Sequence, residues 1–232
     1  MSEKIVSSFD GTHIYYKILG KGAPLFFIHG NSNSHDYFYQ QMAFFKEHYQ
    51  LILMDTRDHG RSSNNAQDLN YQDIMLDILA ILKNEDLKKT SFIGFSDGAN
   101  IALAFGAKYP SHCDKLILAS PNMTYEQLKP SQRWMMDTAY YVTNNLLPLK
   151  KIPRVLRLAM LNIPITDRQR LTWEPPTLVV IGDHDITTPK SMLDYIQPIP
   201  NMQLEVIPRC LHSIPLLKPT IFNRLSLNFL MN

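Results

Sequence analysis

A chain of 232 residues, of which 45% are hydrophobic and 19% charged, carries enough apolar side chains for a full-sized core. This composition excludes a disordered, collagen-like or coiled-coil protein, and one domain is the simplest organisation at this length. The net charge of +2 is too small to indicate a nucleic-acid surface, which excludes that class of partner.

The sequence also bears on cellular location. The longest aliphatic and aromatic runs, such as residues 25–28, are far shorter than the ~20 residues that span a bilayer, so no membrane span is expected. The first residues include an acid and lead to no apolar stretch of a secretory signal. Cys113 and Cys210 are the only cysteines, which favours a reducing compartment. We therefore expect a cytoplasmic protein.

The predicted elements begin with an antiparallel hairpin at a sheet edge, formed by residues 5–9 and 13–18 around the turn Asp10-Gly11. Short apolar runs bounded by turn residues follow, each typical of a strand buried on both faces. They are residues 25–28, 51–54, 91–93, 116–119, 177–181 and 204–207. Segments of helical length are residues 37–48, 71–84, 97–109, 189–196 and 215–231. This alternation predicts an α/β fold with a mostly parallel, doubly wound sheet.

One stretch interrupts the alternation. Residues 121–174 are rich in Met, Tyr and Leu and contain no evident strand, so we expect a helical insertion in a core of residues 1–120 and 175–232. Between Pro121 and Pro175 basic residues exceed acidic ones by four. If Arg154 and Arg157 face the entrance of a site, this charge favours anionic substrates; otherwise they lie on the solvated face of an amphipathic helix.

The segment Gly94-Phe95-Ser96-Asp97-Gly98 joins a predicted strand to a predicted helix and has the pattern G-x-S-x-G. Such a nucleophile elbow holds the serine in a strained turn, where larger side chains two residues before or after it would collide. The alternative is that Ser96 is an ordinary helix N-cap. The position of the pattern between a strand and a helix favours a nucleophile.

A serine nucleophile needs a base, and a histidine base needs an acid to hold its tautomer. The loop after residues 177–181 offers Asp183 and Asp185, and the loop after residues 204–207 offers His212. Both loops follow predicted parallel strands, where open α/β sheets place their sites. The order serine, acid, histidine is the one expected of this fold.

An oxyanion would be held by two backbone N–H groups. We expect one from Asn31, in the loop after residues 25–28, and one from Asp97, at the start of the helix after Ser96. His29 is expected to be structural, Cys210 to be a buried thiol, and Arg57 and Arg61 to fix a loop. No spacing supports His59 or His184 as metal ligands, so we expect no metal and no cofactor.

Taken together, these motifs resemble those of the α/β-hydrolase superfamily over nearly the whole chain. They are His29-Gly30, Asp55-x-Arg57-x-x-Gly60-x-Ser62, the elbow at Ser96, Gly182-Asp183-x-Asp185 and His212. The resemblance implies that Asp185 is the acid, with Asp183 as the alternative, and that residues 121–174 form a helical cap. The chain departs from the family at Leu211, where relatives often have glycine.

The expected function is a cofactor-independent serine hydrolase that cleaves a small carboxylic ester, lactone or thioester through an acyl-enzyme. The resemblance also admits a carbon–carbon bond hydrolase or a perhydrolase with the same triad. A third possibility is a ligand-binding protein that retains the pocket without turnover.

Overall fold

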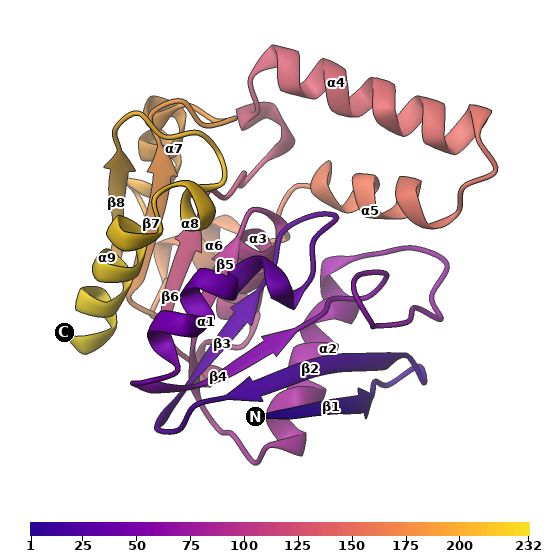
Figure 1. Ribbon diagram of the computed structural model, residues 1–232. Helices are drawn as coiled ribbons and strands as arrows, with labels where there is room; N and C mark the ends of the chain where they lie inside the picture. Colours follow the sequence, from indigo (N-terminus) through magenta and orange to yellow (C-terminus); the bar gives the residue numbers. More distant parts are fainter.

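An eight-stranded sheet forms the centre of the computed structural model, which describes residues 1–232 (Figure 1). In chain order its strands are β1 (Ser2–Ser7), β2 (His13–Leu19), β3 (Ala23–Ile28), β4 (Tyr49–Met54), β5 (Thr90–Phe95), β6 (Cys113–Ala119), β7 (Thr177–Gly182) and β8 (Met202–Ile207). Their order across the sheet is β1-β2-β4-β3-β5-β6-β7-β8. Only the pairs β1–β2 and β2–β4 are antiparallel. The mostly parallel sheet with a hairpin at its edge is therefore confirmed.

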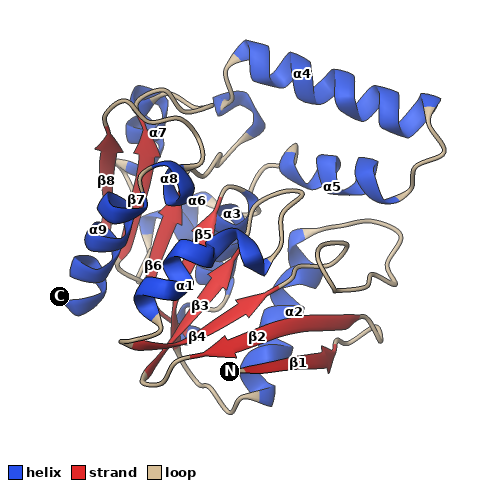
Figure 2. Cartoon of the chain, in the orientation of Figure 1, coloured by secondary structure: helices blue, strands red, loops and turns tan.

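Helices cover both faces of this sheet, as Figures 1 and 2 show. One face packs against α2 (Tyr71–Asn84), α3 (Asp97–Lys108) and α7 (Pro189–Ile196) in a core cluster of 34 residues. The other packs against α1 (Tyr39–Phe45), α8 (Ile214–Leu217) and α9 (Pro219–Met231) in a cluster of 17 residues. The doubly wound arrangement follows from strands that are apolar on both sides.

Two predictions about single elements are wrong. We expected 204–207 to be buried on both faces, but β8 is an edge strand on which Ile207 alone is buried, because no strand lies beyond it. We expected one helix over 215–231, but Lys218 has a φ of −135° and separates α8 from α9. The residue before a proline avoids the helical region, and Pro219 imposes that break.

The segment between β6 and β7 contains a short 3₁₀ turn (Tyr125–Gln127), α4 (Pro130–Tyr141), a π-helical turn (Val142–Leu146), α5 (Lys151–Ala159) and α6 (Asp167–Leu171). In Figure 1 α4 and α5 lie beyond the carboxyl ends of the strands. By contrast, α6 lies against α3, where Gln169 Nε2 donates to the Ala107 carbonyl over 2.9 Å. The division of the chain at residues 121 and 174 stays a prediction.

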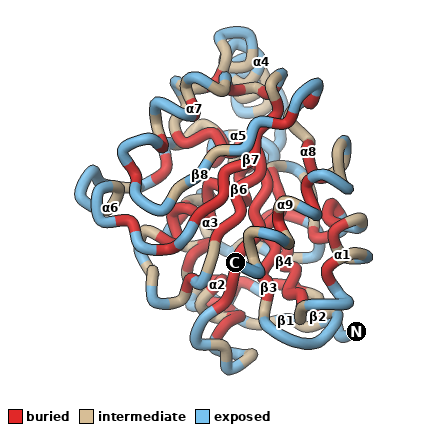
Figure 3. Tube along the Cα trace, turned by 90° about the vertical axis from the view of Figure 1, so that its left-hand side faces the viewer, coloured by how far each residue is buried: buried red, intermediate tan, exposed pale blue.

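Burial separates the sheet from this segment. Figure 3 shows buried residues along the central strands, whereas α4 contains none. Val155, Leu158 and Ala159 of α5 are buried, so α5 is the helix that attaches this arm to the core. No helix of the structure has both the length and the apolar character needed to cross a membrane.

Candidate active site

The turn from β5 into α3 has the geometry of a nucleophile elbow. Ser96 has φ 52° and ψ −119°, a left-handed conformation that is strained for a residue with a side chain. A Cβ on Gly94 would lie 2.4 Å from the Gly98 carbonyl oxygen, and one on Gly98 would lie 2.0 Å from that of Ile28. Both glycines are therefore required by close backbone approach. Ser96 makes no side-chain N-cap hydrogen bond, which argues against the N-cap alternative.

The fold brings Ser96, His212 and Asp185 together from three loops at the carboxyl edge of the sheet. His212 Nδ1 lies 2.7 Å from Asp185 Oδ1, and His212 Nε2 lies 3.0 Å from Ser96 Oγ. An ionised carboxylate only accepts hydrogen bonds, so Nδ1 carries the proton and Nε2 is free to accept one from the hydroxyl. The histidine ring also packs against Phe95 at 5.1 Å between centroids.

Asp185 is fully enclosed. Its side chain is 0% exposed, whereas that of His212 is 24% exposed. Burial raises the pKa of the Asp185 carboxyl, but hydrogen bonds from His212 and the Ile186 N–H outweigh it, so the pKa lies below its usual value. The carboxyl is therefore ionised and can stabilise a protonated imidazole.

Asp183 faces a different partner. Its Oδ2 accepts from the Arg209 N–H over 2.9 Å, and its Oδ1 accepts from the Cys210 N–H over 3.1 Å. The neighbouring His184 ring and these two N–H groups hold the pKa of Asp183 well below its usual value. Asp183 makes no contact with His212, but it fixes the loop on which His212 is carried.

The loop after β3 lies directly beside Ser96. A Cβ on Gly30 would lie 3.1 Å from the Cβ of Ser96. The backbone N–H groups of Asn31 and Asp97 donate to no protein acceptor, so both are available to an oxyanion. Asp97 is 5% exposed. Burial raises the pKa of its carboxyl to about 6, although a hydrogen bond from Asn31 lowers it.

Two residues at the site were not predicted from the sequence. Ser120, directly after β6, donates from Oγ to the His212 carbonyl over 2.6 Å and thereby supports the backbone of His212. Lys129, just before α4, donates from Nζ to the Asp185 carbonyl. Ser120 follows a predicted parallel strand, which was the one signal available for it; nothing in the sequence indicated Lys129.

Three further histidines of the sequence motifs, His29, His59 and His184, have contacts outside the hydrogen-bonded series of Asp185, His212 and Ser96. His29 is buried, with Nδ1 2.8 Å from the Gly30 carbonyl and Nε2 accepting from the Thr56 N–H. His59 Nε2 accepts from the Ser32 N–H over 3.1 Å and so supports the loop after β3. His184 is exposed beside Asp183. The structure groups no three His, Cys, Asp or Glu side chains in a way that could hold a metal ion.

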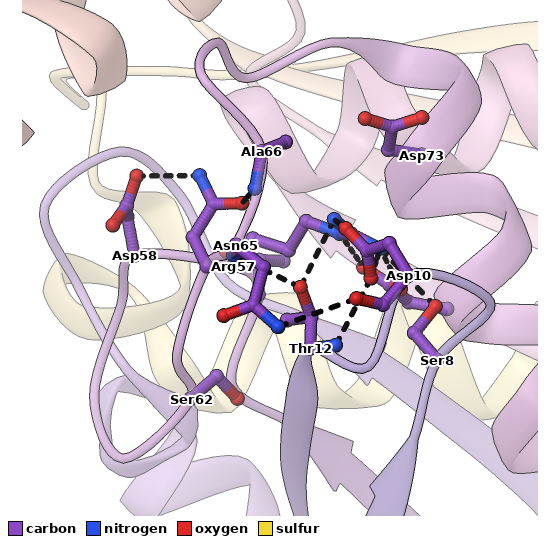
Figure 4. Close-up of polar contacts among 12 residues, drawn as sticks. Ser8, Asp10, Thr12, Arg57, Asp58, Ser62, Asn65, Ala66 and Asp73 are labelled. Atoms are coloured by element: carbon purple, nitrogen blue, oxygen red, sulfur yellow. Dashed lines mark hydrogen bonds and ion pairs between the residues drawn. The ribbon is translucent and has the colours of Figure 1, made fainter.

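Arg57 fixes the loop after β4 through a cluster of polar contacts (Figure 4). Its fully buried guanidinium makes a bidentate pair with Asp77 of α2, at 2.6 and 2.8 Å, and reaches Asp10 of the hairpin at 2.6 Å. The three elements are thus joined through one cation. Arg61, in contrast, makes an exposed pair with Glu3.

The basic residues of α5 point toward the same loop. Arg154 Nη2 lies 2.9 Å from Asp58 Oδ1, and its Nη1 donates to the Ala66 carbonyl over 3.0 Å. Arg157 reaches Asp68 at 3.3 Å, with both side chains more than half exposed. A cavity of about 310 Å³ lies beside Asp58. It is lined by Ser32 and Asn33 of the loop after β3, by His59, and by Lys151 and Val155 of α5.

Comparison with known proteins identifies a family and several relatives. A family model described as the alpha/beta hydrolase fold matches residues 23–149. The serine hydrolase BPHL of Mus musculus is 23% identical over 95% of this chain and 84% of its own length. A non-heme chloroperoxidase of Streptomyces lividans is 34% identical over 50% of this chain and 43% of its own length.

Solved structures share the fold over the whole chain. An esterase from Thermogutta terrifontis superposes with a TM-score of 0.81 at 20% identity, covering 100% of this chain and 98% of its own. The enol-lactonase from Burkholderia xenovorans also gives 0.81, at 16% identity, covering 99% of this chain and 100% of its own. At such identities the likeness concerns the fold.

Proposed function

This chain belongs to the alpha/beta hydrolase fold family, and we propose that it is a serine hydrolase with Ser96 as nucleophile, His212 as base and Asp185 as the acid that orients the base. The observation that carries the proposal is the unbroken hydrogen-bonded series from Asp185 through His212 to Ser96, at 2.7 and 3.0 Å. A strained elbow that presents the serine to this base supports the same assignment.

The proposed reaction proceeds in two steps. As Ser96 Oγ attacks the substrate carbonyl, its proton moves to His212 Nε2, and Asp185 stabilises the resulting imidazolium. The N–H groups of Asn31 and Asp97 bind the oxyanion of the tetrahedral intermediate. His212 then gives its proton to the leaving oxygen or sulfur, which leaves an acyl group on Ser96. Water, activated by the same histidine, releases the acid and restores the serine.

We propose small carboxylic esters, lactones or thioesters as substrates. An esterase and an enol-lactonase are among the proteins of similar fold, which supports ester chemistry as the first choice. A carbon–carbon bond hydrolase is the alternative, because a meta-cleavage product hydrolase also superposes, with a TM-score of 0.76. A perhydrolase with the same three residues and a binding protein without turnover are further alternatives.

The test is covalent labelling with a fluorophosphonate, followed by mass spectrometry of the adduct. We expect one adduct, on Ser96, and none in Ser96→Ala. Ser91→Ala is the matched control, because Ser91 lies on β5, the strand that leads to Ser96, and is also buried. Equal labelling of Ser96→Ala and the parent protein would refute the nucleophile assignment.

Turnover then separates the chemical classes. A panel of p-nitrophenyl esters, lactones, acyl thioesters and a vinylogous diketone identifies the bond that is cleaved. A burst of p-nitrophenol followed by steady turnover indicates an acyl-enzyme. Stoichiometric labelling with neither burst nor turnover on any substrate would favour the binding protein.

A further inference from the structure

The two residues whose N–H groups are assigned to the proposed oxyanion site are also joined through their side chains. Asn31 Nδ2 donates to Asp97 Oδ2 over 2.8 Å. The same amide nitrogen donates to the carbonyl of Val155, in the middle of α5, over 2.7 Å. One side chain therefore links the loop after β3, the first residue of α3 and the helix that attaches the cap segment.

The Asn31 side chain has little freedom in this position. Both of its N–H donors are used, and its Oδ1 accepts from the Ser32 hydroxyl over 2.9 Å. Its partners are themselves fixed, since Asp97 is 5% and Val155 4% exposed. Because Asp97 is a buried acceptor, its bond from the amide is worth more than an exposed one.

Stabilisation of an oxyanion depends on donors held at a fixed spacing before the reaction begins. The N–H of Asn31 lies in a loop, and loops are the mobile parts of a fold. Nothing in the backbone hydrogen bonds ties Asn31 to Asp97. The side-chain amide is the direct link between the two residues.

We propose that Asn31 is a positioning residue, whose side chain sets the spacing of the two oxyanion N–H groups through its bond to Asp97. This rests on the proposed serine hydrolase function and adds to it. The side chain touches neither substrate nor reacting atoms; it acts through the backbone N–H groups of Asn31 and Asp97.

The structure provides a matched control. Asn122 makes a similar buried bridge between the same two helices: its Oδ1 accepts from Asn100 Nδ2 of α3 over 3.0 Å, and its Nδ2 donates to the Ala159 carbonyl of α5 over 3.4 Å. It touches neither oxyanion residue. Loss of the Asn122 amide should therefore lower stability without changing the oxyanion site.

The experiment compares Asn31→Ala, Asp97→Ala, the double variant and Asn122→Ala with the parent enzyme on one ester. Asn31→Ala keeps its backbone N–H. We expect kcat to fall at least tenfold in each single variant with KM within about twofold, because the link acts only on the transition state. A boronic acid, which forms a tetrahedral adduct on the serine, should bind more weakly by a similar factor.

The kcat of the double variant should lie within about threefold of that of the slower single variant, since both changes remove the same link. Asn122→Ala should keep kcat within about twofold. Melting temperatures set an assay temperature at which every variant is folded, and Asn31→Ser serves as a second, milder change. Unchanged kcat and boronate affinity in Asn31→Ala would overturn the proposal, as would multiplied effects in the double variant.

Fluorophosphonate labelling keeps this result separate from the proposed function. If the parent protein is labelled at Ser96 and turns over esters, and the Asn31 variants have the same kcat, only the positioning role is refuted. If the parent protein neither labels nor turns over, the serine hydrolase proposal fails and the positioning role fails with it.

Discussion

At the scale of single residues, two aspartates in one loop have separate tasks. Asp185 faces His212, whereas Asp183 accepts two backbone N–H groups from the loop that carries His212. The side chains differ in burial as well, since Asp185 is fully enclosed and Asp183 is 33% exposed. One aspartate is suited to hold a charge partner and the other to hold a loop.

This division predicts different kinetic effects. Asp185→Asn should lower kcat by about 10⁴-fold, because an amide no longer selects the tautomer with Nδ1 protonated. Asp183→Asn should mainly lower the melting temperature and cost about tenfold or less in kcat. Steady-state kinetics and thermal unfolding of both variants test this. A crippled Asp183→Asn with a mild Asp185→Asn would exchange the two roles.

Asp97 gives a prediction about pH and stability. Burial raises its pKa to about 6 from an ordinary 3.8, so the folded protein binds this proton more tightly than the unfolded chain. The stability gained from that proton is present below pH about 4 and is lost as the pH rises through about 6. Asp97→Asn removes the buried charge and keeps an oxygen for Asn31.

We expect Asp97→Asn to be more stable than the parent protein at pH 8, by about 1–3 kcal/mol, and to lose this advantage by pH 4. Urea unfolding at several pH values measures the difference. Asp194→Asn is the control, because Asp194 is exposed and pairs only with Lys190 on its own helix. An advantage of Asp97→Asn that does not depend on pH would contradict the assignment.

At the scale of elements, α5 attaches the segment between β6 and β7 to the core, and two of its arginines contribute to that contact. Arg154 is 22% exposed and its partner Asp58 only 8%, so the guanidinium is directed to the loop after β4. Arg157 and Asp68 are 53% and 61% exposed. The charge of Arg154 is therefore matched by a carboxylate.

Arg154→Met should destabilise the protein by about 1–3 kcal/mol, because Asp58 is left poorly solvated, whereas Arg157→Met should change stability by less than about 0.5 kcal/mol. Arg154→Met should lower kcat/KM for a neutral ester and for a carboxylate-bearing ester of similar size by the same factor. A loss confined to the anionic ester, and weakened by salt, would instead indicate electrostatic steering.

At the scale of the whole molecule, the order of the strands assembles the site. Strands β3, β5, β6, β7 and β8 are consecutive neighbours in the sheet, and each ends at the same edge. The residues that follow them supply Asn31, Ser96, Ser120, Asp185 and His212. Positions up to 181 residues apart in the chain therefore meet in one place, as in other open α/β sheets.

The sequence by itself determined most of the elements and the tight turn at Ser96. Apolar runs bounded by turn residues located the parallel strands, and α2 and α7 begin and end where the pattern predicts. Gly94 and Gly98 were recognisable because close backbone approach restricts those positions to glycine. Such properties are local, so a single sequence records them.

Only the tertiary structure decided which groups meet. It gave Asp185 and Asp183 different partners and placed Ser120 and Lys129 against the backbone of His212 and Asp185. It joined Asn31 to Asp97 and α5. It also directed Arg154 to Asp58. These contacts connect segments far apart in the chain, and a side chain's partner depends on its direction and on packing, for which periodicity and motif spacing carry no information.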